Sequence, residues 1–199
     1  MPFSNFRFLI VDDDISHLDE LDAKLKALNA SHVFRSDCGQ NAVGTMLSME
    51  KPVDCVLCNY GMPRGNGLQV LQYIRMGRVK TLRPDACVLV FSGDRAPPII
   101  KAAGELDVSG YLITPFSPPQ LVAAVTKGRS RYFKADFSRY ATVAIPDYIA
   151  GGVHQTESDA GPAKEIVAED TGDSGRRAMA DLITQSLRAK KQTAAQEGQ

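Results

Sequence analysis

The chain has 199 residues, of which 44% are hydrophobic and 23% are charged, so it is long enough for one globular domain and an extension. Its 23 basic and 23 acidic residues cancel, so no long-range field favours nucleic acid or an anionic membrane as a partner. The sequence has no apolar run near the roughly 20 residues that a membrane helix needs and no signal-peptide pattern at its start, so we expect a cytoplasmic protein.

An apolar run at residues 7–11 predicts the first strand, and three aspartates follow it at once: Asp12, Asp13 and Asp14. The next segment predicts an amphipathic helix, because its apolar residues recur at helical spacing. Asp14 or Ser16 is placed to cap the start of this helix. Its apolar residues are Ile15, Leu18, Leu21, Leu25 and Leu28.

A short second strand is predicted at residues 33–36, and a second helix at about residues 40–49. The third strand is the apolar run at residues 56–58, which stops abruptly at Asn59. A Met-Pro pair and a glycine-rich turn follow, and helical spacing returns at Gly67. Open α/β sheets bind ligands at the carboxyl ends of their strands, so we expect the functional site near Asn59.

The second half of the predicted domain repeats the same alternation of strand and helix. Residues 86–92 and 110–113 predict the fourth and fifth strands, and residues 118–127, capped by the preceding serine, predict the fifth helix. Pro97 and Pro98 can only begin the fourth helix, because proline is tolerated in the first turn of a helix and not inside it. The apolar stripe of this fourth helix is thin, so we expect it to be weakly held; it is Ile99, Ile100 and Ala103. Five strands alternating with five helices predict an α/β fold with a parallel sheet covered on both faces.

The nine residues from Asn59 to Gly67 resemble the phosphorylation-site segment of response-regulator receiver domains, whose pattern is Asp-x-x-Met-Pro-x-x-x-Gly. The departure is at the first position, where the phosphate-accepting aspartate of the family is Asn59. The resemblance covers residues 5–128 and implies a receiver domain of two-component (phosphorelay) signal transduction, without enzymatic activity. It also implies a flavodoxin-like, doubly wound, five-stranded parallel sheet in the order 2-1-3-4-5.

The resemblance implies a place for a metal ion. Asp12 and Asp13 match the two carboxylates that follow the first strand in receivers, and the backbone carbonyl of Gly61 matches a further ligand of Mg²⁺. The third carboxylate of the family is absent, because Asn59 has no anionic oxygen and cannot attack a phosphoryl group. We therefore expect Mg²⁺ binding to be weak. Without the resemblance, the aspartates also fit an acid-rich helix start.

Four further positions match residues that respond to phosphorylation in receivers: Ser92, Tyr111, Thr114 and Pro115. The hydroxyl, the aromatic ring and the proline are kept, whereas the lysine of the family is Thr114. The loss of one anion and one cation leaves the local charge sum unchanged, so neither charge is left unpaired. Ser92 also fits a simple strand-end cap, and Tyr111 a half-buried strand aromatic.

Composition changes after residue 128. Residues 129–173 are expected to be irregular or disordered, because residues 151–175 have almost no large apolar side chains. Residues 129–139 mix aromatic rings with four basic residues, so they either pack back on the domain or bind a nucleotide or second messenger. These basic residues are Arg129, Arg131, Lys134 and Arg139. Residues 174–191 predict an amphipathic helix that docks on the receiver or on another molecule.

These observations predict a pseudo-receiver that acts through phosphorylation-independent protein–protein interaction. Its expected partners are a histidine kinase, an output protein or another receiver; nucleic acid and membrane are not expected, and the oligomeric state is open. The predicted contacts lie around the fourth helix and fifth strand: Ile99, Lys101, Tyr111 and Phe116. The alternatives are a Mg²⁺-dependent regulator that is phosphorylated on another acceptor, and a nucleotide or second-messenger binder that uses residues 129–139.

Overall fold

The structure is a computed structural model that describes residues 2–147, in which five parallel strands form one sheet in the order β2-β1-β3-β4-β5. The predicted α/β fold and strand order are therefore confirmed, and strand ends differ from prediction by one residue at most. The strands are β1 (Arg7–Val11), β2 (His32–Ser36), β3 (Cys55–Asn59), β4 (Cys87–Ser92) and β5 (Gly110–Ile113).

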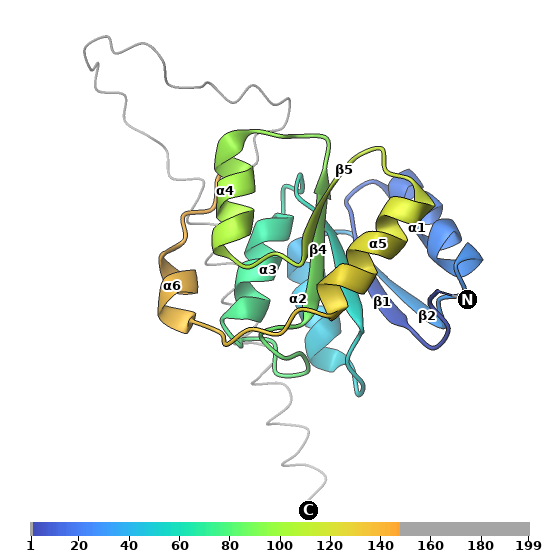
Figure 1. The fold of residues 1–199 in the computed structure, drawn as a ribbon, viewed down its shortest axis with the longest axis horizontal. Coiled ribbons are helices and arrows are strands. Elements are labelled where there is room, and N and C mark those ends of the chain that lie inside the picture. The colour runs from blue at the N-terminus through green and yellow to red at the C-terminus, as the bar shows by residue number, and fades with distance from the viewer. Residues whose placement is uncertain (1, 148–199) are drawn as a thin grey trace, which may run out of the picture.

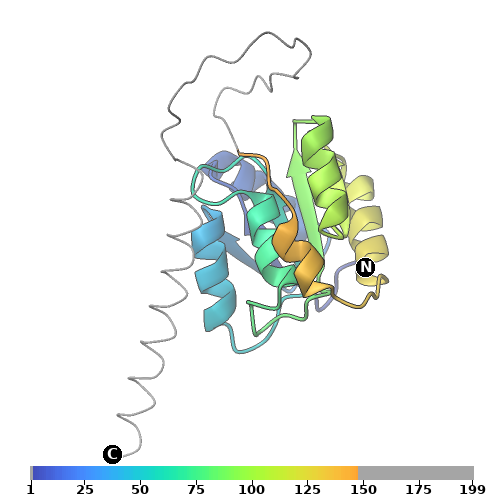
Figure 2. The ribbon, with the colours of Figure 1, turned by 90° about the vertical axis from the view of Figure 1, so that its left-hand side faces the viewer.

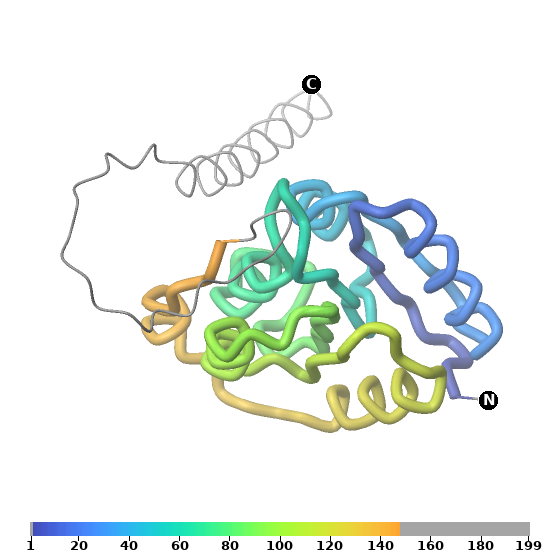
Figure 3. Tube along the Cα trace, turned by 90° about the horizontal axis from the view of Figure 1, so that it is seen from above, coloured from blue at the N-terminus to red at the C-terminus, as the bar shows by residue number. Residues whose placement is uncertain are grey.

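Helices cover both faces of the sheet (Figures 1 and 3). Helices α1 and α5 cover one face and α2, α3 and α4 the other, because each side contributes apolar residues to its own half of the core. Between residues 2 and 147, no helix is long and apolar enough to cross a membrane. The helices are α1 (Ile15–Ala27), α2 (Gly39–Ser48), α3 (Gly67–Arg75), α4 (Pro97–Glu105), α5 (Pro118–Arg129) and α6 (Phe137–Thr142).

The apolar stripe of α1 faces the sheet only from its second turn onward. Leu18, Leu21 and Leu25 are buried, whereas Ile15 is 69% exposed, so its predicted place in the core is wrong. Ile15 is the first residue of the helix, and the side chains that pack on the sheet begin at Leu18. Of the two predicted caps, Asp14 is the residue used: its Oδ1 accepts hydrogen bonds from the backbone N–H groups of Ser16 and His17.

Helix α4 begins at Pro97, as predicted, and its N-cap residue Ala96 supplies no side-chain hydrogen bond. Its buried side chains are Ile99, Ala102 and Ala103, which belong to the core on the α3 side of the sheet. Ile100 is 41% exposed and does not belong to the buried stripe. The two adjacent isoleucines therefore divide between core and surface, which the predicted stripe did not distinguish.

Packing of the chain continues beyond α5. Residues 130–147, which we call the strap, run under the sheet, form α6 and lie against α3 (Figure 2). The side chains of Tyr140, Val143 and Ile145 are buried core members, although they lie beyond the predicted boundary at residue 128. The side chain of Gln72 on α3 donates hydrogen bonds to the carbonyls of Tyr140 and Val143. The strap is therefore an integral part of the packed domain.

Three of the four basic residues of the segment 129–139 contact the domain itself. Arg129 pairs with Asp54, and Arg139 pairs with Asp107, which also accepts a hydrogen bond from Tyr140. Arg131 donates to the carbonyl of Val108. Of the two predictions for residues 129–139, packing on the domain is the one that the contacts support. The predicted amphipathic helix at residues 174–191 lies outside the described residues.

Candidate functional site

The carboxyl ends of β1 and β3 bring Asp12 and Asn59 together. The two strands pair in parallel with Val11 opposite Cys58, so the residues that follow these two, Asp12 and Asn59, lie at the same edge of the sheet. The Nδ2 of Asn59 donates a hydrogen bond to Oδ1 of Asp12 at 3.0 Å, and the Oδ1 of Asn59 accepts one from the backbone N–H of Gly61 at 3.1 Å. Both ends of the amide are therefore used, with the donor directed at the carboxylate.

The start of α3 holds this edge in place. A Cβ on Gly67 would lie 2.6 Å from the carbonyl oxygen of Asn59, so only glycine allows the helix to begin so close to the strand. Asn66 and Gln69 form a capping box that fixes the first turn of the helix. From the strap, the carbonyl of Pro146 accepts hydrogen bonds from the Tyr60 hydroxyl and the Asn66 amide. The loop that carries Asn59 is thus held from two sides.

Asp12 is 1% exposed, and its two oxygens have different surroundings. Oδ1 accepts from Asn59 and from the backbone N–H of Asp14, whereas Oδ2 is buried without a hydrogen-bond partner. The imidazole of His17 lies beside it, with Nδ1 3.5 Å from Oδ2. Burial raises the pKa of the Asp12 carboxyl above its ordinary value of 3.8, and the two hydrogen bonds oppose this rise.

The folded pKa of Asp12 lies above its unfolded value, so the folded state binds the proton more tightly. Stability is therefore lost as the pH rises from the unfolded pKa through the folded one. We therefore expect Asp12→Asn to raise the free energy of unfolding at pH 7 by about 1–2 kcal/mol, because the amide keeps the shape of the carboxylate and removes the charge that burial penalises. The gain should disappear at a pH below both pKa values. Urea unfolding at a series of pH values measures it.

The exposed neighbour Asp13 supplies the control for this measurement. Asp13→Asn should change the free energy of unfolding by no more than about 0.5 kcal/mol at either pH, as is usual for a surface position. If Asp12→Asn is no more stable than the wild type at pH 7, the buried carboxylate of Asp12 does not destabilise the folded protein.

The residues at this edge do not fit a three-carboxylate site for Mg²⁺. The amide of Asn59 directs its donor, not its oxygen, at Asp12, and Asp13 is exposed. Within residues 2–147, no group of three His, Cys, Asp or Glu side chains is placed to hold a metal ion. Mg²⁺ prefers several oxygen ligands in near-ideal octahedral geometry, and here Oδ1 of Asp12 already accepts hydrogen bonds from Asn59 and from the backbone N–H of Asp14.

Restoring the third carboxylate tests this interpretation. Asn59→Asp should bind Mg²⁺ more than about tenfold more tightly than the wild type, because a unit charge about 4 Å from a cation contributes several kcal/mol even at an effective dielectric constant of 20. Without Mg²⁺ the same variant should be less stable than the wild type, since two carboxylates then face each other. Urea unfolding without Mg²⁺ measures the difference in stability, and the increase in stability on titration with Mg²⁺ measures the affinity. Equal Mg²⁺ affinities would show that carboxylates at positions 12 and 59 do not form a Mg²⁺ site.

The other four predicted positions lie on the neighbouring strands β4 and β5 or directly after β5. Ser92 is buried at the end of β4, where its Oγ accepts a hydrogen bond from the backbone N–H of Asp94. Tyr111 on β5 is half-buried, and its hydroxyl donates to the carbonyl of Asp94 at 3.0 Å. The backbone N–H of Thr114 donates to the carbonyl of Ser92, and the peptide bond from Thr114 to Pro115 is cis. The backbone of Asp94 therefore contacts both side chains, its N–H at Ser92 and its carbonyl at Tyr111, although the sequence pattern did not indicate this residue.

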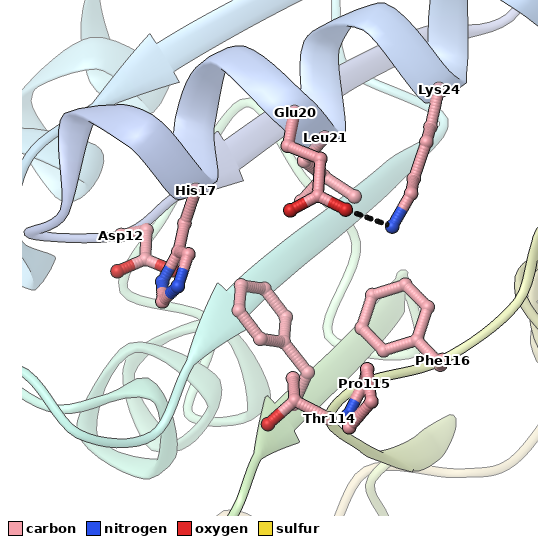
Figure 4. Close-up of a pocket in the computed structure, with 9 residues that line it drawn as sticks. Asp12, His17, Glu20, Leu21, Lys24, Thr114, Pro115 and Phe116 are labelled. Carbon is pink, nitrogen blue, oxygen red and sulfur yellow. Dashed lines mark ion pairs between the residues drawn. The ribbon is translucent and has the colours of Figure 1, made fainter.

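A cleft of about 320 Å³ lies beside Asp12 between α1 and the end of β5 (Figure 4). It brings Asp12 together with three predicted residues of the β5–α5 connection, Thr114, Pro115 and Phe116. His17, in the first turn of α1, also faces the cleft beside Asp12, although no pattern in the sequence singled it out. The full lining is Asp12, His17, Glu20, Leu21, Lys24, Phe91, Thr114, Pro115 and Phe116.

The predicted partner contacts differ in exposure. Lys101 is exposed, and Tyr111 and Phe116 are half-buried, so all three reach the surface. The prediction for Ile99 is wrong, because its side chain is fully buried and packs in the core. Ile100, the next residue, is the isoleucine that faces solvent.

A family model described as the response regulator receiver domain matches residues 8–126. Among curated proteins, the chain is 28% identical over 161 residues to the transcriptional regulatory protein DcuR of Escherichia coli K12, covering 76% of this chain and 62% of DcuR. It is 27% identical over 119 residues to the probable chemotaxis protein CheY of Rhizobium etli, covering 60% of this chain and 88% of that protein.

Solved structures show the same architecture. The chemotaxis protein CheY4 of Vibrio cholerae superposes with a TM-score of 0.54 at 19% identity, covering 62% of this chain and 98% of CheY4. A putative response regulator from Chloroflexus aurantiacus gives a TM-score of 0.54 at 25% identity, covering 64% of this chain and all of that chain (100%).

Proposed function

The chain belongs to the response regulator receiver family, and we propose that it is a receiver of two-component signalling that acts without being phosphorylated. The observation that carries the proposal is the hydrogen bond from Asn59 to Asp12. A carboxylate at position 59 would be a nucleophile toward a phosphoryl group, whereas an amide is not. Here the amide nitrogen is also committed to a buried carboxylate.

The hydrogen bond between Asn59 and Asp12 also favours a single conformation at the carboxyl ends of β1 and β3. The Asn59 amide satisfies Asp12 Oδ1 directly, so neither a metal ion nor a phosphoryl group is needed to hold the loop. Thr114, at the position where the family has lysine, has no charge with which to pair a phosphoryl group. A partner of this receiver must therefore recognise a conformation that is populated without covalent modification.

We place the partner surface on α4 and β5, around Ile100, Lys101 and Tyr111. An exposed isoleucine beside an exposed lysine and a half-buried tyrosine offers one apolar and one charged contact close together. Protein interfaces combine an apolar or aromatic centre with a polar rim, and these residues supply both. The partner is a histidine kinase, an output protein or another receiver; the chain spans only 62% of DcuR, so the regulatory output of that protein is not carried over.

The double variant Ile100→Asp, Lys101→Glu tests this surface. Both residues are exposed, so the domain should fold, while reversing one charge and removing one apolar contact should weaken partner capture by at least about tenfold, or about 1.4 kcal/mol. The tagged full chain is used to capture proteins from its source cells, with and without acetyl phosphate, and retained proteins are quantified by mass spectrometry.

Lys80→Glu, an exposed lysine between α3 and β4, is the matched control and should retain the partner. Capture should be the same with and without acetyl phosphate. Capture that requires acetyl phosphate contradicts phosphorylation-independent binding, whereas retention of the partner by the double variant places the interaction on another face.

A further inference from the structure

The buried Oδ2 of Asp12 has no hydrogen-bond donor, although its side chain lines the cleft between α1 and the β5–α5 connection. A buried acceptor without a donor costs free energy, so such an atom is usually satisfied by a ligand or by water. The imidazole of His17 lies across it at 3.5 Å, and this histidine side chain is 62% exposed, so it is free to rotate into solvent. Figure 4 shows the His17 imidazole beside the Asp12 carboxylate, so rotation of this ring into solvent would leave Oδ2 facing the cleft.

The walls of the cleft are suited to a cation on an apolar stem. Phe91 and Phe116 meet edge to face at 5.9 Å, and both rings line the cleft. The ammonium of Lys24 already lies 5.6 Å from the centre of the Phe116 ring, which shows that this ring accepts a positive charge. Lys24 is itself neutralised by Glu20 at 2.7 Å, so the charge left over in the cleft is that of Asp12.

We propose that this cleft binds a guanidinium or primary ammonium group carried on a short aliphatic stem. The nitrogen donates a hydrogen bond to Oδ2 of Asp12 in place of the His17 imidazole, and the stem packs between Leu21 and Phe116. Such a group comes either from a free small molecule or from an arginine or lysine side chain of a protein. Binding leaves the hydrogen bond from Asn59 to Asp12 Oδ1 in place, so it does not depend on the proposed mode of signalling.

Binding of two probes distinguishes the sources: agmatine, a free guanidinium compound, and a capped Gly-Arg-Gly peptide. Each is titrated into the full chain by calorimetry, with EDTA present to exclude divalent ions. Binding of agmatine assigns the cleft to small molecules, and binding of the peptide alone assigns it to side chains of a macromolecule. Either result supports the proposal; if neither probe binds, it is overturned.

Three variants test the contacts. Asp12→Asn removes the charge but keeps the shape of the side chain. It should lower the affinity for the probe at least about tenfold, the range for a charged hydrogen bond. His17→Ala removes the competing imidazole and should tighten binding. Thr114→Lys should abolish binding, because Thr114 lines the same cleft and the new ammonium competes for Oδ2.

Thr114→Met is the matched control for bulk without charge. It should reduce binding by crowding the cleft, yet only Thr114→Lys should also raise the thermal midpoint of the free protein by pairing with Asp12. Since Asp12→Asn is itself expected to be more stable than the wild type, loss of binding in that variant cannot be attributed to unfolding. Equal affinity of the probe for Asp12→Asn and for the wild type overturns the proposal.

Discussion

Replacing Arg75 by methionine is expected to lower the free energy of unfolding by about 4 kcal/mol, which is a large share of the stability of an ordinary domain. Arg75 is the largest fully buried side chain among residues 2–147, and its guanidinium donates to backbone carbonyls rather than to a carboxylate. Those carbonyls belong to Pro84, Ala86, Leu106 and Asp107. Methionine fills most of the volume but leaves these buried acceptors without a donor.

The arginine is charged at neutral pH although burial lowers its pKa to about 10. Urea unfolding of Arg75→Met measures the loss. Arg78→Met, on an exposed arginine three residues later, is the control and should change stability by less than about 1 kcal/mol. A loss below about 1 kcal/mol for Arg75→Met would contradict the role given to these hydrogen bonds.

Arg75 also explains how the strap is joined to the receiver. Its guanidinium connects the end of α3 with the turns before β4 and β5, and it lies 5.0 Å from the centre of the Phe133 ring in the strap. From the same strap, the hydroxyl of Tyr140 reaches Asp107, whose carbonyl accepts from Arg75. One buried cation thus ties the α4–β5 turn, α3 and the strap together.

Residues 5–128 could be predicted well because local patterns and tertiary packing agree there. The strands of this sheet are buried on both faces, so they read as short apolar runs closed by turn residues, as at residues 56–58. Pro97 fixed the start of α4, since proline is compatible only with the first turn of a helix.

The errors come from features that periodicity does not contain. Ile15 and Ile100 both belong to predicted apolar stripes, yet both are exposed, because which isoleucine is buried depends on where each helix lies over the sheet. Helix α6 has only six residues, too short to show a period, and Tyr140 becomes a core residue only because the strap returns to α3. Packing of residues 129–139 on the domain was one of the two predictions, but the composition did not indicate that Tyr140 would enter the core.

The candidate site was found for a different reason. Asn59 and Asp12 are 47 residues apart, and parallel pairing of two apolar strands was enough to place them together. The orientation of the Asn59 amide could not be predicted, because an amide oxygen and an amide nitrogen fit the same position. The structure directs the nitrogen at Asp12, which changes a weak metal ligand into a hydrogen-bond donor.

The most direct test of a receiver that signals without phosphate is to offer it phosphate. The full chain is incubated with acetyl phosphate and Mg²⁺, and its intact mass is measured under conditions that preserve acyl phosphates. Asn59→Asp, Thr114→Lys, which restores both family residues, is treated in parallel as the matched variant. We predict no added phosphoryl group on the wild-type chain, because Asn59 has no nucleophilic oxygen and Thr114 no charge. An acid-labile, hydroxylamine-sensitive adduct on the wild-type chain would contradict the account.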